Sequence, residues 1–135
     1  MAMIKRFEEI KAWQKARELV GGVYRSCVAG AIANDYGLKG QLCRAAVSSM
    51  SNVAEGFARR TGKDFAHFLD VAKGSAIEVQ SLLYVAIDVG YFAQEEFQRL
   101  YKTADELSSL IGGFSTYLRR APRPSDRATE RLSDE

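Results

Sequence analysis

The sequence is poor in the residue types that build disulfide frameworks and metal centres. Its 135 residues include two cysteines, Cys27 and Cys43, and one histidine, His67. Both cysteines lie on predicted apolar helix faces, which is typical of free buried thiols and not of a disulfide framework. A histidine metal site or a Cys–His nucleophile pair would have to use His67, whose neighbours Ala66 and Phe68 give no ligand spacing. The sequence therefore predicts neither a metal nor another cofactor.

Long apolar runs and strand patterns are also lacking. No run approaches the ~20 apolar residues that span a bilayer, and no apolar region follows the charges of the N-terminus as in a secretory signal. No period-2 alternation is bounded by turn residues, which excludes a sheet and a phosphate loop that follows a strand. With 47% hydrophobic and 27% charged residues, the composition is that of a soluble domain. We expect a cytoplasmic protein without a membrane partner.

The stretch 41–60 is the clearest helical pattern. Leu42, Ala46, Ser49, Val53 and Gly56 recur at steps of four and three, which predicts a helix with a broad apolar face. Many of its residues are small, which favours close approach of a neighbouring helix. The pattern alone leaves open whether that neighbour belongs to the same chain or to another subunit.

Similar periodicities predict helices at about 7–29, 36–60, 62–90 and 94–120. In the last of these, the predicted core face is Phe97, Leu100, Ala104, Leu107, Ile111, Phe114 and Leu118. Because the connections are short, we expect an all-α domain over residues 1–120, an up-down-up-down antiparallel four-helix bundle. Residues 121–135 are polar and contain both prolines, which predicts a disordered tail.

A polar stripe follows the second helix and continues on the third. A tight turn near residues 61 and 62 pairs positions whose numbers sum to about 123. Ser48 then faces Ser75, and Arg44 reaches Glu78 in a predicted ion pair. Asn52 and Glu55 are expected to bond to another helix or subunit. The full predicted network is Arg44, Ser48, Asn52, Glu55, Ser75 and Glu78. It is a structural network that fixes helix register, or else Arg44, Asn52, Glu55 and Glu78 form a site that holds a metal or a phosphate ester.

Charge is distributed unevenly along the chain. Residues 1–60 carry ten Lys or Arg and five Asp or Glu, hence +5, whereas residues 61–135 carry nine and twelve, hence −3. A basic first half favours a surface for a polyanion. The alternative is that the two halves pair and largely cancel on solvated surfaces.

The central helices resemble the 23S rRNA intervening-sequence proteins. The resemblance is carried by Gln41-Leu-Cys-Arg44-Ala-Ala-Val-Ser48, Asn52-Val-Ala-Glu55-Gly56-Phe57, Phe65-Ala-His67-Phe68-Leu69 and Ala72-Lys-Gly74-Ser75 with Glu78, and it covers roughly residues 5–118. The chain departs from the family pattern at Ser49 and Met50, where members commonly have an apolar residue and then proline. A proline kink in the second helix is therefore absent.

The resemblance implies a small cytosolic bacterial protein that assembles as a ring-shaped homopentamer, with a relative that binds nucleic acid. It implies no catalytic residues. The first hypothesis is thus a non-enzymatic homo-oligomer that contacts the phosphates of RNA or DNA through basic side chains. These are Lys11, Lys15, Arg17, Arg25, Lys39, Arg59, Arg60 and Lys63. The second hypothesis is a structural or protein-partner scaffold without affinity for nucleic acid. A third is an enzyme that uses Glu55 and Glu78.

Overall fold

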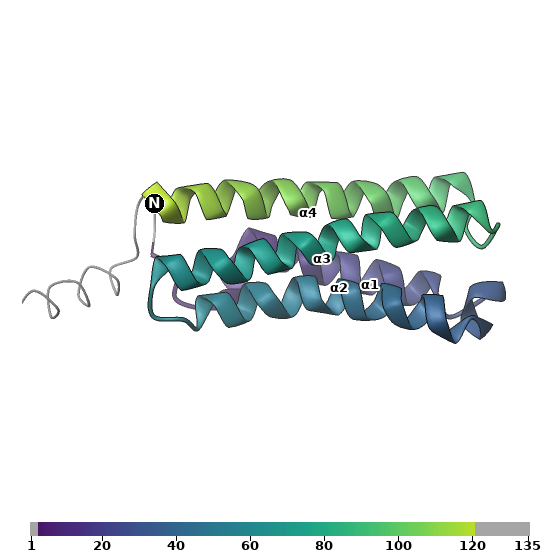
Figure 1. The fold of residues 1–135 in the computed structure, drawn as a ribbon, viewed down its shortest axis with the longest axis horizontal. Coiled ribbons are helices and arrows are strands. Elements are labelled where there is room, and N and C mark those ends of the chain that lie inside the picture. Colours follow the sequence, from purple (N-terminus) through teal and green to yellow (C-terminus); the bar gives the residue numbers. More distant parts are fainter. Residues whose placement is uncertain (1–2, 121–135) are drawn as a thin grey trace, which may run out of the picture.

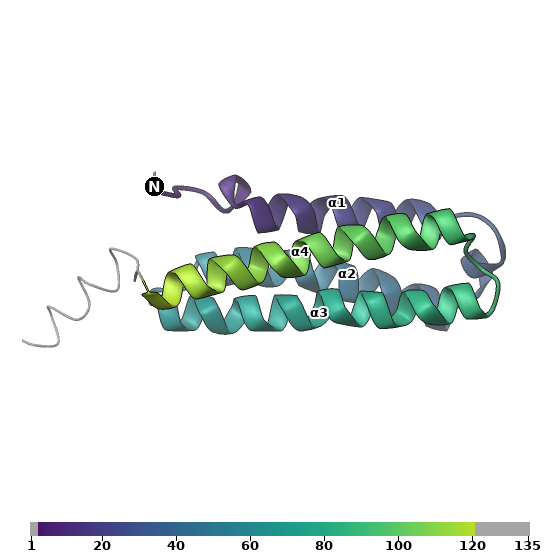
Figure 2. The same ribbon diagram turned by 90° about the horizontal axis from the view of Figure 1, so that it is seen from above.

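The computed structural model describes residues 3–120, and its helices follow the periodicities of the sequence (Figure 1). The helices are α1 (Lys11–Ser26), α2 (Tyr36–Phe57), α3 (Gly62–Asp88) and α4 (Gln94–Arg120), with two 3-10 helices, η1 (Phe7–Glu9) and η2 (Ala31–Asn34). No strand occurs within residues 3–120. Both α1 and α3 pack against α2 and α4, so α1 and α3 lie diagonally across an antiparallel bundle (Figure 2). The predicted all-α bundle is confirmed, and the predicted tail at 121–135 lies outside the described residues.

Four predicted helix boundaries differ from the structure. The first helix begins at Lys11 instead of residue 7, because Ile10 is extended, with φ −75° and ψ 121°, and separates η1 from α1. It ends at Ser26 instead of residue 29, because the next residue, Cys27, has φ −100° and ψ 0° and leaves the helical conformation. The second helix ends at Phe57 instead of residue 60.

The third helix ends at Asp88 instead of residue 90, and a left-handed glycine ends it. Gly90 has φ 82°, a conformation that costs glycine little. The Tyr91 N–H then donates to the Ala86 carbonyl at 2.8 Å, and the Gly90 N–H donates to that of Ile87 at 3.1 Å. These two bonds satisfy carbonyls that the end of a helix leaves unpaired.

Side-chain caps begin the two central helices. The Thr61 hydroxyl accepts a hydrogen bond from the Asp64 N–H at 3.1 Å, as its position before α3 predicts. The Asp35 carboxylate accepts one from the Leu38 N–H at 3.0 Å and a second from the Tyr91 hydroxyl at 2.9 Å. Asp35 therefore caps α2 and also ties its start to the α3–α4 turn.

The Asp35 cap predicts acid sensitivity. The hydrogen bond from the Leu38 N–H, followed by that from Tyr91, lowers the pKa of Asp35 below its ordinary value. A carboxylate with a lowered pKa in the folded state adds stability above its ordinary pKa and loses it as pH falls through the lowered one. Asp35→Asn should therefore reduce the acid-dependent part of unfolding, measured by thermal melts from pH 7 to pH 2. Tyr91→Phe should reproduce part of this change, and identical acid profiles for all three proteins would contradict the assignment.

The core runs the length of the bundle and is lined by all four helices. Its largest fully buried side chains are Phe65, Ile10, Leu19, Ile32, Leu42, Leu69, Leu83, Leu107, Ile111, Val23, Val53 and Val79. Of the predicted face of α4, Phe114 is only partly buried, and the buried position belongs to Ser115, which is 3% exposed. The Phe114 ring instead lies edge-on against Phe65 with centroids 5.2 Å apart.

None of the helices in residues 3–120 has the length and apolar character needed to cross a membrane.

Candidate nucleic-acid interface

The polar stripe forms a hydrogen-bonded seam between α2 and α3. The Asn52 amide donates to the Ser48 hydroxyl at 3.0 Å and to the Ser48 carbonyl at 2.8 Å. The hydroxyls of Ser48 and Ser75 lie 2.8 Å apart, and that of Ser75 donates to the Val71 carbonyl at 3.2 Å. The bonds thus run from Asn52 through both serines to the α3 backbone. Ser48 and Ser75 face each other as predicted from the turn.

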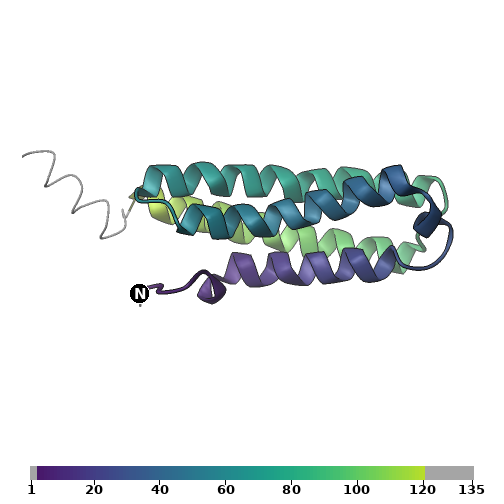
Figure 3. The same cartoon turned by 90° about the horizontal axis from the view of Figure 1, so that it is seen from below.

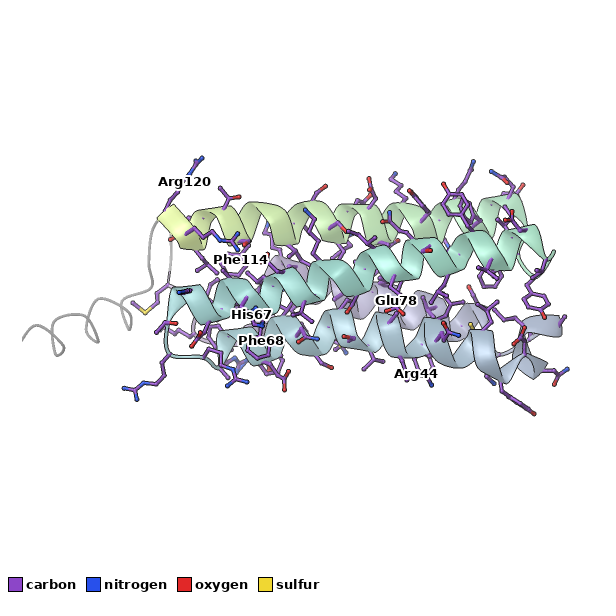
Figure 4. All side chains as sticks on the ribbon, in the orientation of Figure 1. Arg44, His67, Phe68, Glu78, Phe114 and Arg120 are labelled. Carbon is purple, nitrogen blue, oxygen red and sulfur yellow. The ribbon has the colours of Figure 1, made fainter. Side chains whose placement is uncertain are left out.

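The charged members of the predicted network do not join this seam. Arg44, Glu55 and Glu78 are exposed, and among residues 3–120 no ion pair joins Arg44 to Glu78. Figure 4 labels Arg44 on α2 and Glu78 on α3. The Arg44 guanidinium lies over Gly40, where an added Cβ would approach its Nη1 atom to 3.0 Å. The predicted ion pair is therefore wrong, because the long side chain follows the surface of its own helix.

Asn52 and Glu55 also differ from their prediction. Asn52 bonds to Ser48 on its own helix and not to another helix, and Glu55 is exposed to solvent. In the described part of the chain, no group of three or more His, Cys, Asp or Glu side chains could hold a metal ion. The neutral seam is thus suited to fixing the register of two helices, since buried polar groups must be paired.

The seam gives a prediction for stability. Ser48→Ala should lower the free energy of unfolding by about 1 kcal/mol, because Ser75 and Asn52 both lose a hydrogen-bond partner. Arg44→Ala, on the same helix but exposed and without an ion pair to any residue of 3–120, should change it by no more than about 0.5 kcal/mol. Chemical denaturation measures both. An equal cost for the two substitutions would mean that the seam contributes nothing specific.

Several of the predicted phosphate contacts have partners within the chain. The Lys15 ammonium lies 3.0 Å from Glu106 on α4 and 3.0 Å from Glu18. These hydrogen bonds, first that to Glu106, raise the pKa of Lys15, and the same contact lowers the pKa of Glu106. The Lys39 ammonium donates to the Ala33 carbonyl at 3.1 Å. Lys15 and Lys39 therefore bond to groups of the same chain and stabilise the fold.

The other predicted basic residues are divided between α1 and the α2–α3 turn. Lys11, Arg17 and Arg25 are exposed along α1, and the Arg17 guanidinium lies 5.8 Å from the centre of the Trp13 ring. Arg59, Arg60 and Lys63 are exposed at the turn. The structure therefore does not bring all eight residues onto one surface.

The turn residues share their end of the bundle with two further arginines. The described N-terminal segment, the α2–α3 turn and the end of α4 lie at the same end of the molecule (Figure 3). Arg119 and Arg120 lie in the last turn of α4 and are exposed there, and Lys5 and Arg6 are exposed near the start of the described chain. We call the set Lys5, Arg6, Arg59, Arg60, Lys63, Arg119 and Arg120 the basic end. Arg119 and Arg120 were not among the predicted phosphate contacts, although the predicted antiparallel topology places the end of the fourth helix beside the turn.

The arginines of the basic end differ in their surroundings. The Arg59 guanidinium lies 4.4 Å from the centre of the Phe68 ring, a stacking arrangement that arginine favours. The Arg119 guanidinium donates to Ser115 at 2.6 Å and to Asp70 at 2.9 Å. Carboxylates also lie here, namely Glu8, Glu9, Glu55, Asp64 and Asp70, so cations exceed acids by seven to five. Arginine forks bind phosphate in a bidentate manner, which a lysine cannot do.

Comparisons with known proteins agree with this fold. The sequence profile of the family described as "23S rRNA-intervening sequence protein" matches residues 8–113. A crystal structure of a protein with unknown function from the S23 ribosomal protein family of Bacteroides thetaiotaomicron VPI-5482 superposes with a TM-score of 0.71 at 20% identity. The superposition covers 77% of this chain and 97% of the other. No curated protein matches the sequence.

Proposed function

Because the chain belongs to the 23S rRNA-intervening sequence protein family, we propose that it is a non-enzymatic, homo-oligomeric protein of the cytoplasm that binds nucleic acid through its basic end. The observation that carries the proposal is the gathering of exposed arginines at one end of the bundle, namely Arg59, Arg60 and Arg120, with Arg119 beside them in its ion pair with Asp70. Repetition of this end in a ring-shaped homopentamer would multiply its charge on one face.

RNA is the favoured ligand over DNA. The family description refers to 23S rRNA, and the similar crystal structure belongs to a protein named for a ribosomal family. Phosphate contacts account for affinity and also for its salt dependence, because each neutralised phosphate releases counterions. The basic end offers only surface arginines and lysines, which predicts recognition of the backbone and little reading of base sequence.

The test compares two triple variants of equal charge change. Arg59→Gln/Arg60→Gln/Lys63→Gln neutralises the turn, and Arg44→Gln/Lys73→Gln/Arg99→Gln neutralises three exposed cations elsewhere. Fluorescence anisotropy with a labelled structured RNA and a labelled single-stranded DNA measures affinity across a salt titration. We expect the turn variant to bind RNA at least about tenfold more weakly, with a shallower salt dependence. The control variant should retain most of the affinity.

Either of two results would overturn the binding proposal. One is that the natural sequence binds neither ligand at low salt, and the other is that both triple variants lose affinity equally. The first result would favour the second candidate function, a protein-partner scaffold. That candidate is supported by exposed apolar side chains on α3 and just after it. Ile77 and Val85 on the helix are 51% and 45% exposed, and Val89, which follows its last residue, is 56% exposed.

A further inference from the structure

The two cysteines of the chain meet between the end of α1 and the first turns of α2. Cys27 directly follows α1, and its N–H donates to the Val23 carbonyl at 3.1 Å. Cys43 lies on α2. These two parts of the chain lie at the same end of the bundle, away from the basic end (Figure 1). Both thiols are free, and they are in hydrogen-bonding contact with each other. We name Cys27 and Cys43 the thiol pair.

The two thiols differ in their access to solvent. Cys27 is 2% exposed and belongs to the core, whereas Cys43 is partly buried and packs against the outside of that core. Burial, followed by the charge and the hydrogen bond of Cys43, raises the pKa of Cys27 to about 11. Cys27 is therefore a protonated thiol at neutral pH, and the thiolate is the reactive form of cysteine. A small oxidant in solution accordingly reaches and oxidises Cys43 first.

A fixed cation lies beside the thiol pair. Lys39 precedes Cys43 by one turn of α2, and its ammonium donates to the Ala33 carbonyl in the connection between α1 and α2. The charge of Lys39 acts on Cys27 against the effect of burial, toward a lower pKa. A nearby cation stabilises a thiolate. Lys39 therefore helps Cys27 to lose its proton at the moment when it reacts.

We propose that Cys27 and Cys43 form a reversible disulfide bond when the protein meets a peroxide, with Cys43 oxidised first and Cys27 completing the bond. The sulfurs of a disulfide are about 2.05 Å apart, and the two thiols are already in contact. An accessible cysteine with a second cysteine beside it is typical of proteins that respond to oxidants. The inference is independent of nucleic-acid binding, because the thiol pair and the basic end lie at opposite ends of the bundle.

The reaction consumes one peroxide for each disulfide. The Cys43 thiolate attacks one peroxide oxygen, so that an S–O bond forms while the O–O bond breaks. The hydroxide released takes up the proton that Cys43 has lost and becomes water. The Cys27 sulfur then attacks the Cys43 sulfur, the S–S bond forms, and the S–O bond breaks as hydroxide leaves with the Cys27 proton. Two thiols have lost two electrons, and hydrogen peroxide has been reduced to two molecules of water.

The bond would join α1 directly to α2. It closes a loop that contains η2 and the start of α2, which reduces the conformational entropy of the unfolded chain. Oxidation should therefore stabilise the bundle, and reduction should return it to its original stability. Disulfides of this reversible kind are the ones that occur in reducing compartments.

Mass spectrometry of the full chain tests the bond. The protein is reduced with dithiothreitol, freed of it and exposed to hydrogen peroxide, and the remaining thiols are alkylated under denaturing conditions. We expect a monomer that has lost two hydrogen atoms, carries no alkyl group and yields a peptide in which Cys27 is joined to Cys43. Dithiothreitol should restore both thiols. A Cys43 that gains oxygen while Cys27 remains open to alkylation would overturn the proposal.

Two variants test the order of the steps. Cys43→Ser leaves only the buried thiol, which should react with hydrogen peroxide at least about tenfold more slowly than the thiols of the natural sequence. Cys27→Ala leaves Cys43 without a partner, so Cys43 should react at about its natural rate but gain oxygen atoms instead of losing hydrogen. Circular dichroism checks that both variants are folded. Equally fast oxidation of Cys43→Ser would contradict the role of Cys43 as the first residue to react.

Thermal melts test the effect on the fold. The oxidised natural sequence should melt about 10 °C higher than the reduced one, as expected for a disulfide that closes a loop of this length. Treatment of Cys27→Ala with peroxide should give no such increase, because no bond can form. An oxidised natural sequence with an unchanged melting temperature would overturn the stabilising role of the bond.

Discussion

Phe65→Ala is expected to lower the free energy of unfolding by about 3–5 kcal/mol. The ring is 1% exposed, and it meets Phe57 and Phe114 edge-on with centroids 6.2 Å and 5.2 Å away. Truncation removes the transfer free energy of the ring and both aromatic contacts, and it leaves a cavity that three helices line. Urea denaturation followed by circular dichroism measures the loss.

Phe114→Ala is the matched control for this prediction. Its ring is partly buried at the edge of the same cluster, so we expect a clearly smaller loss than for Phe65→Ala. If the two substitutions cost the same, Phe114 would be as well buried as the periodicity of α4 predicts, and the structure of this end of the bundle would be wrong.

Gly56→Val should destabilise the protein by several kcal/mol. A Cβ at Gly56 would lie 2.7 Å from Phe65 Cδ1 and 2.9 Å from Phe68 Cβ, and both contacts are far shorter than van der Waals separation. The Phe65 ring is packed on its other sides and cannot move away, so each added carbon forces α2 and α3 apart. Overpacking of this kind costs about 1–3 kcal/mol or more.

Gly113→Ala is the control for Gly56. Nothing lies within 4 Å of a Cβ at Gly113, so alanine should stabilise α4 by about 0.5–1 kcal/mol through helix propensity. Combining Gly56→Ala with Phe65→Ala should cost less than the sum of the two, because the cavity accepts the added methyl group. Thermal melts of the single and double variants test this coupling, and strict additivity would mean that the two residues do not touch.

The sequence predicted positions along the chain better than the directions of side chains. The pairing of Ser48 with Ser75 could be predicted because a short turn fixes the register of two antiparallel helices, and short side chains stay close to the backbone. Arg44 has a long side chain, and the absence of a Cβ at Gly40 gives its guanidinium a place on its own helix. The register of two helices does not predict the direction in which such a long side chain extends.

Burial was predicted with an error of one residue in α4. The hydrophobic pattern selected Phe114, but the helix turns Ser115 inward, where its hydroxyl accepts a hydrogen bond from Arg119. Where an aromatic residue stands beside a small one, the hydrophobic pattern assigns the aromatic residue to the buried face. Packing against α3 decides which of the two is buried. The basic end was not predicted as one surface, because its arginines come from segments about 60 residues apart in the chain and were considered one segment at a time.

The Thr61 turn also has a consequence for the order of folding. Only four residues separate α2 from α3, so closing this hairpin costs little loop entropy, and its contacts are local in sequence. The packing of α1 against α4 instead joins the first and last helices of the chain, which are far apart in sequence. We therefore expect the α2–α3 hairpin to form in the rate-limiting transition state and α1 to dock afterwards. Stopped-flow kinetics should show that Leu69→Ala mainly slows folding and Leu19→Ala mainly speeds unfolding, and the reverse pattern would place the nucleus at the other side of the bundle.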